Sequence, residues 1–295
     1  MDRRRFLSTG VQRSTAAIAG SLLAATTSLA QTPPNRRQET PLPSPRPDAG
    51  RKARVFITGS ADGLGHAAAA TLLAEGHEVV VHVRSKARLP AVEALVDQGA
   101  IATIGDLADL AQIRDLAGQV DAIGRMDAII HNAGVISGAS LLVVNVVAPY
   151  LLTALIQRPQ RLIYLSSSMH RGGRAELAGL DWSGRTATGS YSDSKLFVTA
   201  LAAAVARRWP DVFSNAVDPG WVPTRMGGAN APDDLRLGHL TQEWLATSDD
   251  PQARTSGGYW HHQQRQAPHP AVGDTKFQDA LLGELARATG TTLPG

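Results

Sequence analysis

The feature that most constrains this chain is a regular alternation of short apolar runs with segments of helical composition between residues 54 and 220. The run Arg-Val-Phe-Ile-Thr at 54–58 predicts a strand, and the alanine-rich segment after it predicts a helix that ends at Gly76. Strands that alternate with helices of about 10–15 residues indicate parallel β-α-β units. Strands that are apolar on both faces fit a sheet covered by helices on both sides. We therefore expect a single α/β domain with a doubly wound parallel sheet, a Rossmann-like fold.

The rest of the domain continues this pattern. Further strands are expected within 77–83, 100–107, 126–134, 161–168 and 212–220, and helices over 86–98, 108–123, 140–157 and 190–208. Residues 256–262 are expected to form a final edge strand, with a helix near 275–289 behind it. Residues 225–255 surround a short helix, in the place of a substrate lid. In such a fold the ligand site lies at the carboxyl ends of the strands.

Residues 1–30 have the layout of a signal peptide. Their four arginines against one acidic residue account for the whole formal net charge of +3. A mildly apolar segment follows the basic start and ends in the small-x-small sequence Ser28-Leu29-Ala30, which is typical of a cleavage site. The segment is shorter than the about 20 apolar residues of a membrane span. We expect cleavage, with an uncleaved anchor or a plain extension as the alternatives, and no stable membrane span after processing.

The first arginines resemble a twin-arginine signal. Residues 3–7 read Arg-Arg-Arg-Phe-Leu, although Asp2 stands where Ser or Thr is usual. The twin-arginine export machinery carries folded proteins, so a periplasmic location is expected, with a cytoplasmic one as the alternative. Residues 31–53 are expected to be a linker, because six prolines and almost nothing apolar occur within 31–50. The folded domain is then expected over 54–295.

Composition excludes several other kinds of site. Beyond residue 30 the charges balance, and no basic face favours nucleic-acid binding. The chain has no cysteine, which excludes disulfides, thiolate metal sites and Cys nucleophiles. Its nine histidines lack paired ligand spacing such as His-Glu-x-x-His, so we expect no metal site.

A glycine-rich turn joins the first predicted strand to the first predicted helix. Gly59, Gly63 and Gly65 have the spacing G-x-x-x-G-x-G. Glycine lets the backbone turn tightly and approach a diphosphate, and the helix N-terminus presents free N–H groups to it. A plain structural turn is the alternative, which the position after the first strand of the array weakens. The turn therefore predicts a dinucleotide site.

The second predicted strand ends in a basic sequence that bears on the choice of cofactor. An acidic residue at this place would bind the 2′-hydroxyl of NAD, but the sequence there is Arg84-Ser85-Lys86. Arg84 could pair with a 2′-phosphate, which favours NADP(H) while leaving NAD(H) open. A solvated surface arginine is the alternative.

An ordered set of motifs resembles the short-chain dehydrogenase/reductase family over about residues 54–225. The interval of 24 residues between Ser167 and Tyr191 resembles the retinol-dehydrogenase-like branch, whose members often have a longer loop here. In that loop, Asp181-Trp182 is expected to pack the loop rather than to touch substrate. The motifs in chain order are Thr58-Gly59-x-x-x-Gly63-x-Gly65, Asn132-Ala133-Gly134, Asn145, Ser167, Tyr191-x-x-x-Lys195 and Pro219-Gly220.

The resemblance implies a catalytic set of Asn145, Ser167, Tyr191 and Lys195. Tyr191 and Lys195 share one helix face, and a nearby ammonium is expected to lower the pKa of the phenol. Tyr191 would be the general acid or base, and Lys195 would also hold the nicotinamide ribose. Ser167 would bind the substrate oxygen, with Ser168 as the second choice, and Asn145 would support Lys195 through water. Asn145 as a plain helix residue is the alternative.

The resemblance also implies where the cofactor is held. The helices around 140–157 and 190–208 often form dimer interfaces in this family, so a homodimer is allowed. The implied cofactor-binding residues are Gly59, Ser60, Asp62, Gly63, Leu64, Gly65, Arg84, Asp106, Leu107, Asn132, Ala133, Gly134, Tyr191, Lys195, Pro219, Gly220, Val222 and Thr224.

The expected function is an NADP-preferring oxidoreductase that moves a hydride between nicotinamide and a small-molecule carbonyl or alcohol substrate, with the protein positioning the cofactor and supplying the proton. A dehydratase or epimerase on the same fold is an alternative within enzymes. A non-catalytic NAD(P)-binding sensor is the alternative of another class, but it would need the glycine turn without the Ser, Tyr, Lys and Asn set.

Overall fold

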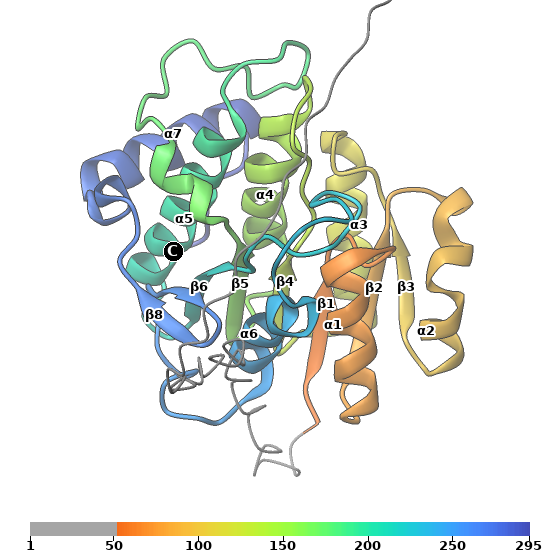
Figure 1. The fold of residues 1–295 in the computed structure, drawn as a ribbon. Helices are drawn as coiled ribbons and strands as arrows, with labels where there is room; N and C mark the ends of the chain where they lie inside the picture. Colours follow the sequence, from red (N-terminus) through yellow and green to blue (C-terminus); the bar gives the residue numbers. More distant parts are fainter. Residues whose placement is uncertain (1–51) are drawn as a thin grey trace, which may run out of the picture. The chain divides into compact units, whose positions relative to one another are not determined.

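The structure, a computed structural model, describes residues 52–295, so the expected signal peptide (1–30) and almost all of the expected linker (31–53) lie outside the described residues. Eight strands form one sheet in the order β3-β2-β1-β4-β5-β6-β7-β8 (Figure 1). All neighbours pair in parallel except β7 and β8, which are antiparallel. The strands are β1 (Arg54–Ile57), β2 (Glu78–Val83), β3 (Ile101–Ile104), β4 (Ala128–His131), β5 (Arg161–Leu165), β6 (Phe213–Asp218), β7 (Tyr259–His261) and β8 (Gln264–Gln266).

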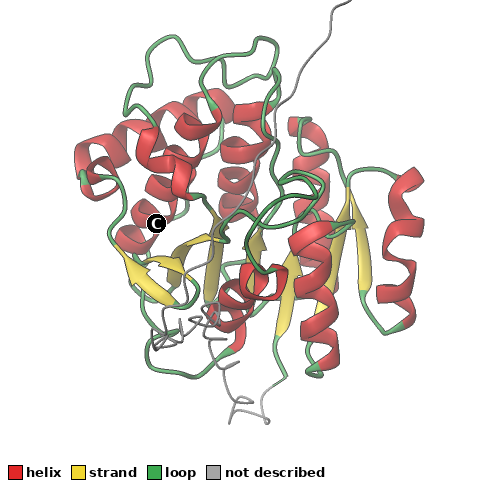
Figure 2. Ribbon diagram, viewed as in Figure 1, coloured by secondary structure: helices red, strands yellow, loops and turns green. Residues whose placement is uncertain are grey.

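Helices cover both faces of the sheet (Figures 1 and 2). One apolar core joins the sheet to α3, α4 and α5, with α7 packed outside α5. A second core joins the other face to α1, α2 and α6. The doubly wound α/β fold expected from the alternation is therefore confirmed. The helices are α1 (Gly63–Ala74), α2 (Glu93–Asp97), α3 (Leu110–Ile123), α4 (Ala148–Leu155), α5 (Tyr191–Arg208), α6 (Leu235–Thr247) and α7 (Thr275–Thr289).

The predicted edge strand is not the edge of the sheet. Strand β7 lies within the expected range of 256–262, but β8 pairs outside it. His262 and Gln263 both have positive φ (48° and 61°), which is the backbone of a tight hairpin turn. The prediction missed β8 because its three residues, Gln-Arg-Gln, are all exposed and carry no apolar pattern.

Two predicted helices contain irregular turns. The segment expected over 86–98 is a 3₁₀ stretch, η1 (Lys86–Val92), followed by the short helix α2. Pro90 lies inside η1, where it cannot donate a backbone hydrogen bond. The helix expected over 140–157 contains a π-helical turn, η2 (Val143–Val147), directly before α4.

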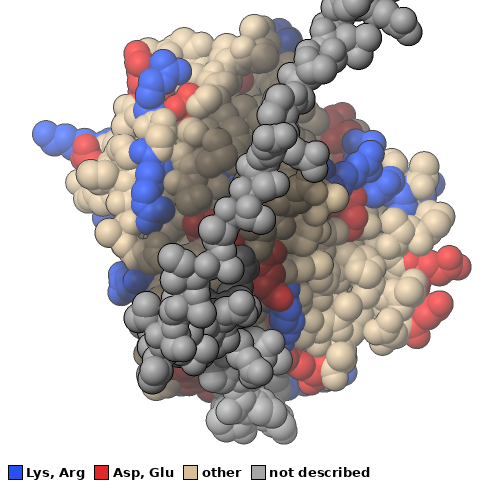
Figure 3. All heavy atoms as spheres, in the orientation of Figure 1, with Lys and Arg blue, Asp and Glu red and all other residues tan. Residues whose placement is uncertain are grey.

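The face of the molecule shown in Figure 3 has no large patch of a single charge sign. On the face shown in Figure 3, basic and acidic side chains lie interspersed among other residues.

The helices expected to support a homodimer are largely buried in the single chain, since residues 148–154 of α4 are all buried and α7 packs on α5. The homodimer stays a prediction. Within residues 52–295, no helix combines the length and apolar character needed to cross a membrane.

Candidate active site

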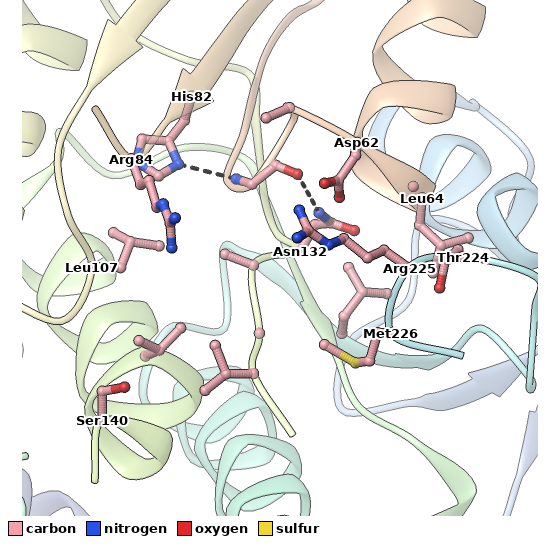
Figure 4. Close-up of a pocket in the computed structure, with 18 of the residues that line it drawn as sticks. Asp62, Leu64, His82, Arg84, Leu107, Asn132, Ser140, Thr224, Arg225 and Met226 are labelled. Carbon is pink, nitrogen blue, oxygen red and sulfur yellow. Dashed lines mark hydrogen bonds between the residues drawn. The ribbon is translucent and has the colours of Figure 1, made fainter. Parts of the chain in front are cut away.

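A cavity of about 510 Å³ lies at the carboxyl ends of the strands, where the sheet order switches between β1 and β4 (Figure 4). This is where a doubly wound fold binds its ligand. Most of the predicted cofactor residues line the cavity: Gly59, Asp62, Gly63, Leu64, Arg84, Asp106, Leu107, Asn132, Ala133, Gly134, Tyr191, Lys195, Pro219 and Thr224.

The glycine turn leaves room along the floor of this cavity. Gly59 and Gly63 have positive φ (68° and 56°), which side-chain-bearing residues rarely adopt. A Cβ on Gly59 would come within 3.0 Å of Ala133, and one on Gly65 would lie 2.3 Å from the Asn132 amide nitrogen. Gly65 therefore packs against Asn132 behind the cavity rather than lining it.

Ser60 and Asn132 hold the glycine turn from behind. The Ser60 hydroxyl donates to the Ile57 carbonyl (2.6 Å) and is completely buried, so it does not face the cavity. The Asn132 amide donates to the carbonyls of Thr58 (2.9 Å) and Gly59 (3.2 Å). These contacts fix the turn in place.

His82 supports the turn from the neighbouring strand, a role that sequence reasoning did not assign. Its Nδ1 accepts a hydrogen bond from the Gly59 N–H (3.0 Å, Figure 4), so its Nε2 carries the proton and donates to the Gly105 carbonyl (2.7 Å). Burial lowers the pKa of His82, and the carbonyl contact only partly opposes this. A neutral imidazole therefore fixes the backbone of the glycine turn.

Basic side chains lie at the β2 end of the cavity. Figure 4 shows Arg84 extending from the end of β2 toward Leu107. Arg88 also lines the cavity and pairs with Asp62 at 3.3 Å. Asp106 accepts from the Ala108 N–H (2.9 Å), so its carboxylate shapes the loop after β3. Sequence reasoning missed Arg88 because the 3₁₀ segment that carries it was expected to be an ordinary helix.

Ser167 is the serine that meets the candidate catalytic tyrosine. Its hydroxyl lies close to the Tyr191 phenol and opposes the rise in the tyrosine pKa. Ser166 is buried, with its hydroxyl 2.6 Å from that of Thr199. Ser168 is exposed. The structure therefore brings together the predicted pair of Ser167 and Tyr191.

The pKa of Tyr191 differs from the expectation. A nearby lysine was expected to lower it, but burial, together with the smaller effect of the Asp218 carboxylate, raises the pKa of Tyr191 to about 12. The Lys195 ammonium lies 5.5 Å from the centre of the Tyr191 ring and donates to the Leu165 carbonyl (2.7 Å). Lys195 is therefore engaged at the end of β5 rather than with the phenol oxygen, and in this state Tyr191 is protonated at neutral pH.

The pKa of the Lys195 side chain lies close to neutral pH. Burial lowers its pKa to about 8, and the charge of Asp218 opposes this shift. A Cβ on Gly134 would lie 3.6 Å from the Lys195 nitrogen and 3.4 Å from the Asn145 amide oxygen. Gly134 thus keeps open the space in which these two side chains meet the cavity.

Asn145 lies in the π-helical turn, and its amide holds the loop after β4. The amide oxygen accepts from the Val135 N–H (2.8 Å), and the amide nitrogen donates to the Val135 carbonyl (2.9 Å) and the Ser194 hydroxyl (3.0 Å). These direct contacts fix the cavity wall at Val135. Support of Lys195 through water stays a prediction.

Asp218, which sequence reasoning left without a role, ends β6 beside the reactive residues. Its buried carboxylate accepts from the Tyr259 hydroxyl (2.9 Å) and from the Gly220 N–H (3.0 Å). Gly220 has a φ of 80°, and a Cβ there would come within 2.6 Å of Asp233. Val222 is buried rather than lining the cavity. Gly220 and Val222 therefore shape the segment that carries Thr224.

The longer loop before Tyr191 is built as expected. Trp182 is buried and packs against Phe197, with ring centres 5.9 Å apart. The Asp181 carboxylate accepts from the backbone N–H groups of Ser183 (2.9 Å) and Thr186 (2.7 Å). The Ser183 hydroxyl also donates to this carboxylate, and this hydrogen bond, followed by the backbone ones, lowers the pKa of Asp181 to about 2. Asp181 and Trp182 therefore stabilise the loop, by hydrogen bonds and by packing respectively.

Comparison with known proteins places this geometry among oxidoreductases. Residues 53–154 match the family model described as short chain dehydrogenase. An uncharacterised oxidoreductase of Emericella nidulans is 34% identical over 82% of this chain and 99% of its own length. The short-chain dehydrogenase chry4 of Gibberella zeae is also 34% identical, with the same two coverages.

Two further similarities extend the comparison. Human retinol dehydrogenase 13 is 26% identical over 51% of this chain and 54% of its own length. A blue fluorescent protein from a metagenomic library, solved in complex with NADPH, superposes with a TM-score of 0.59 at 24% identity, over 71% of this chain and 95% of that one. The structural likeness shows the shared fold.

Proposed function

Because this chain belongs to the short-chain dehydrogenase family, we propose that it is an NADP(H)-preferring oxidoreductase acting between a carbonyl and an alcohol. The main support for the proposal is that Ser167, Tyr191 and Lys195 lie close together beside the cavity that begins at the glycine turn. The retinol dehydrogenase similarity supports assignment to the longer-loop branch.

The residues present fit a nicotinamide dinucleotide. The cavity volume of about 510 Å³ is within the range of ligand sites, and Gly59 and Gly63 leave its floor free of side chains. The diphosphate would be held at the glycine turn and the N-terminus of α1. Thr224 and Lys195 would hold the nicotinamide end. When bound, the cofactor supplies or accepts the hydride.

The chain itself supplies the proton. Tyr191, with its pKa near 12, holds a proton at neutral pH and donates it to the carbonyl oxygen as negative charge develops there. The Ser167 hydroxyl orients that oxygen through a second hydrogen bond. The buried Lys195 ammonium offsets the charge left on the phenol. In alcohol oxidation the same groups act in reverse.

The preference for NADP(H) rests on the end of β2. Arg84 reaches the cavity wall there (Figure 4), where a carboxylate would instead bind a ribose hydroxyl. A guanidinium forms charge-assisted hydrogen bonds to phosphate oxygens. This contact would favour the phosphorylated cofactor over NAD(H).

A spectrophotometric screen tests the proposed reaction. The purified chain is mixed with NADPH and a panel of aldehydes and ketones, and the loss of absorbance of the reduced nicotinamide is followed. We expect consumption that depends on the carbonyl compound. Tight NADPH binding without consumption across the panel would support the sensor instead, and conversion of a substrate with no net change in NADPH would support a dehydratase or epimerase.

The expected export of the protein is a separate part of the proposal. The sequence of residues 3–7 supports export of the folded enzyme with its cofactor already bound. Cell fractionation tests this: we expect the mature chain to begin at Gln31 in the periplasm with NADP(H) bound. Full-length protein confined to the cytosol would reject export and leave the proposed reaction unaffected.

A further inference from the structure

Exposed apolar side chains gather around the candidate active site. In the part of the chain that the structure describes, six large apolar residues are exposed, and four of them lie in the segments that follow β4, β5 and β6. The other two, Val96 and Ile101, lie at α2 and β3, the far edge of the sheet. We call the first four the apolar rim: Ile136 (56% exposed), Met169 (52%), Trp221 (59%) and Met226 (45%).

Two members of the apolar rim lie next to the candidate reactive groups. The backbone N–H of Met169 donates to the Ser167 hydroxyl at 3.2 Å, so its side chain leaves the chain beside the serine. Met226 lines the same cavity as Tyr191 and projects into it in Figure 4. Both side chains therefore lie next to the groups that a substrate carbonyl would reach.

The other two members continue the rim on the neighbouring loops. Ile136 follows Val135, which lines the cavity and is fixed by Asn145. Trp221 follows directly after the turn at Pro219. Because the carboxyl ends of parallel strands meet at one edge of a sheet, these loops border the same opening.

Trp221 is exposed but held in place. Its indole N–H donates to the Gly227 carbonyl (2.8 Å), and its backbone N–H donates to the Asp233 carboxylate (2.6 Å). The Asp233 N–H donates back to the Trp221 carbonyl (3.1 Å). The polar atom of the indole is thus satisfied within the protein, which leaves the apolar ring surface available at a reduced entropic cost of binding.

Two arginines in the segment that follows Ser167 are already engaged by the protein. Arg171 donates to the Ala267 carbonyl (3.0 Å) and to Gln266 (3.3 Å). Arg174 pairs with Asp193 at 3.4 Å. Arg225 lines the cavity beside Asn132 at the glycine turn (Figure 4), the end of the cavity proposed to hold the cofactor diphosphate. A polyhydroxylated substrate that reaches Ser167 would therefore find Arg171 and Arg174 already paired.

We propose that the apolar rim selects carbonyl compounds with an extended apolar body, aliphatic or aromatic. This inference rests on the proposed function and names the substrate class for the same site. An apolar patch that borders a small group of polar reactive residues is the composition of a ligand-binding groove. The carbonyl group meets Ser167 and Tyr191, while the apolar body covers Trp221 and the methionines.

Two matched substrate series test the proposal with NADPH. One consists of straight-chain aldehydes of increasing length, and the other of polyhydroxylated aldehydes with the same carbon numbers. We expect kcat/KM to rise by about tenfold or more along the apolar series, because each added methylene buries apolar surface, and to show no such rise along the polar series. Equal or better use of the polar series would overturn the proposal while leaving the proposed reaction intact.

Substitutions in the apolar rim test whether these side chains cause the gain in kcat/KM along the apolar series. Trp221→Ala should lower kcat/KM for the longest aldehyde by about five- to tenfold, with a loss that grows with chain length. Trp221→Phe, which keeps an apolar ring, should lose less, and Val96→Ala, a remote exposed apolar residue, is the matched control. A Trp221→Ala loss no larger than that of Val96→Ala would overturn the role of the rim. No turnover in either series would reject the proposed function, and this inference with it.

Discussion

At the residue scale, burial raises the pKa of Tyr191 and lowers the pKa of Lys195. Burial disfavours the charged form of each group, so the tyrosine holds its proton to a pKa of about 12 while the lysine releases its proton at about 8. Asp218 raises the pKa of both groups. The phenol is therefore protonated throughout the neutral range, and the charge of the lysine is more sensitive to pH.

This tuning predicts the pH dependence of carbonyl reduction. Below about pH 8 both groups are protonated, so kcat/KM should be nearly constant, and above it the loss of the Lys195 charge should lower the rate. Initial rates from pH 6 to 10 measure this profile. Lys195→Arg, which retains its charge, should move the decline to higher pH. A wild-type rate that stays constant up to pH 10 would show that the lysine charge is not required.

Arg84 gives a second prediction at this scale. Arg84→Ala should weaken NADPH binding by about 10- to 100-fold, because charge-assisted hydrogen bonds to the 2′-phosphate are lost, and should change NADH binding much less. Fluorescence titration with both cofactors measures the two affinities. Arg287→Ala, an exposed arginine paired with Glu284 on α7, is the control. Equal losses for NADPH and NADH would remove the argument for a phosphate contact.

At the element scale, the π-helical turn η2 connects packing to the site. Asn145→Leu should destabilise the protein by about 1–3 kcal/mol, since it leaves the N–H and carbonyl of Val135 without their partner. Urea unfolding measures this change. Asn145→Asp keeps an acceptor for the Val135 N–H but places a buried carboxylate oxygen against the Val135 carbonyl, so it should also destabilise the protein. Equal stability of the leucine variant and the wild type would contradict the structural role of this amide.

Sequence patterns were sufficient to predict the positions of some strands and helices but not of others. Strands β1 to β6 and helices α3, α5 and α7 carry clear apolar patterns and fall within the ranges expected for them, whereas α1 begins at Gly63, within the glycine turn. Strand β8 and the π-turn were not predicted, because β8 has only exposed polar residues and the turn is a local change of hydrogen bonding inside a helical composition. The hairpin after β7 depends on two non-glycine residues with positive φ, for which the sequence His-Gln gives no signal.

At the scale of the whole molecule, buried neutral histidines should make the fold acid-sensitive. Burial lowers the pKa of His131 to about 3, and burial also lowers those of His82 and His170. Above pH 6.5 the folded and unfolded chains both hold these groups neutral. Below pH 6.5 the unfolded chain binds the protons first, so stability should fall with pH, by up to about 1.4 kcal/mol per pH unit for a fully buried histidine.

His131 tests this prediction. It lies between Tyr164, with ring centres 4.7 Å apart, and the Thr153 hydroxyl, 3.1 Å from its Nε2. His131→Asn should reduce the dependence of the unfolding free energy on pH between 6.5 and 4, whatever its effect on stability at pH 7. Denaturant unfolding at a series of pH values measures that slope. An unchanged slope in the variant would assign the acid sensitivity to other groups.

The overall site was more predictable than its electrostatics. The residues of the glycine turn, Tyr191 and Lys195 follow from spacing along the chain, and the fold brings them to one cavity. The raised pKa of Tyr191 could not be predicted, because it depends on burial by distant segments and on Asp218, which β6 places nearby. The support of Gly59 by His82 likewise arises only when β1 and β2 pair.

The central claim is that Tyr191 supplies the proton in a carbonyl reduction that uses NADPH. The most direct measurement compares the turnover and NADPH affinity of Tyr191→Phe with those of the wild type, using the carbonyl compound that the wild type reduces best. We predict that turnover falls by a factor of about 100 or more, while the dissociation constant for NADPH changes by less than about threefold, since only the acidic hydroxyl is removed. Turnover at the wild-type rate in Tyr191→Phe would contradict the account.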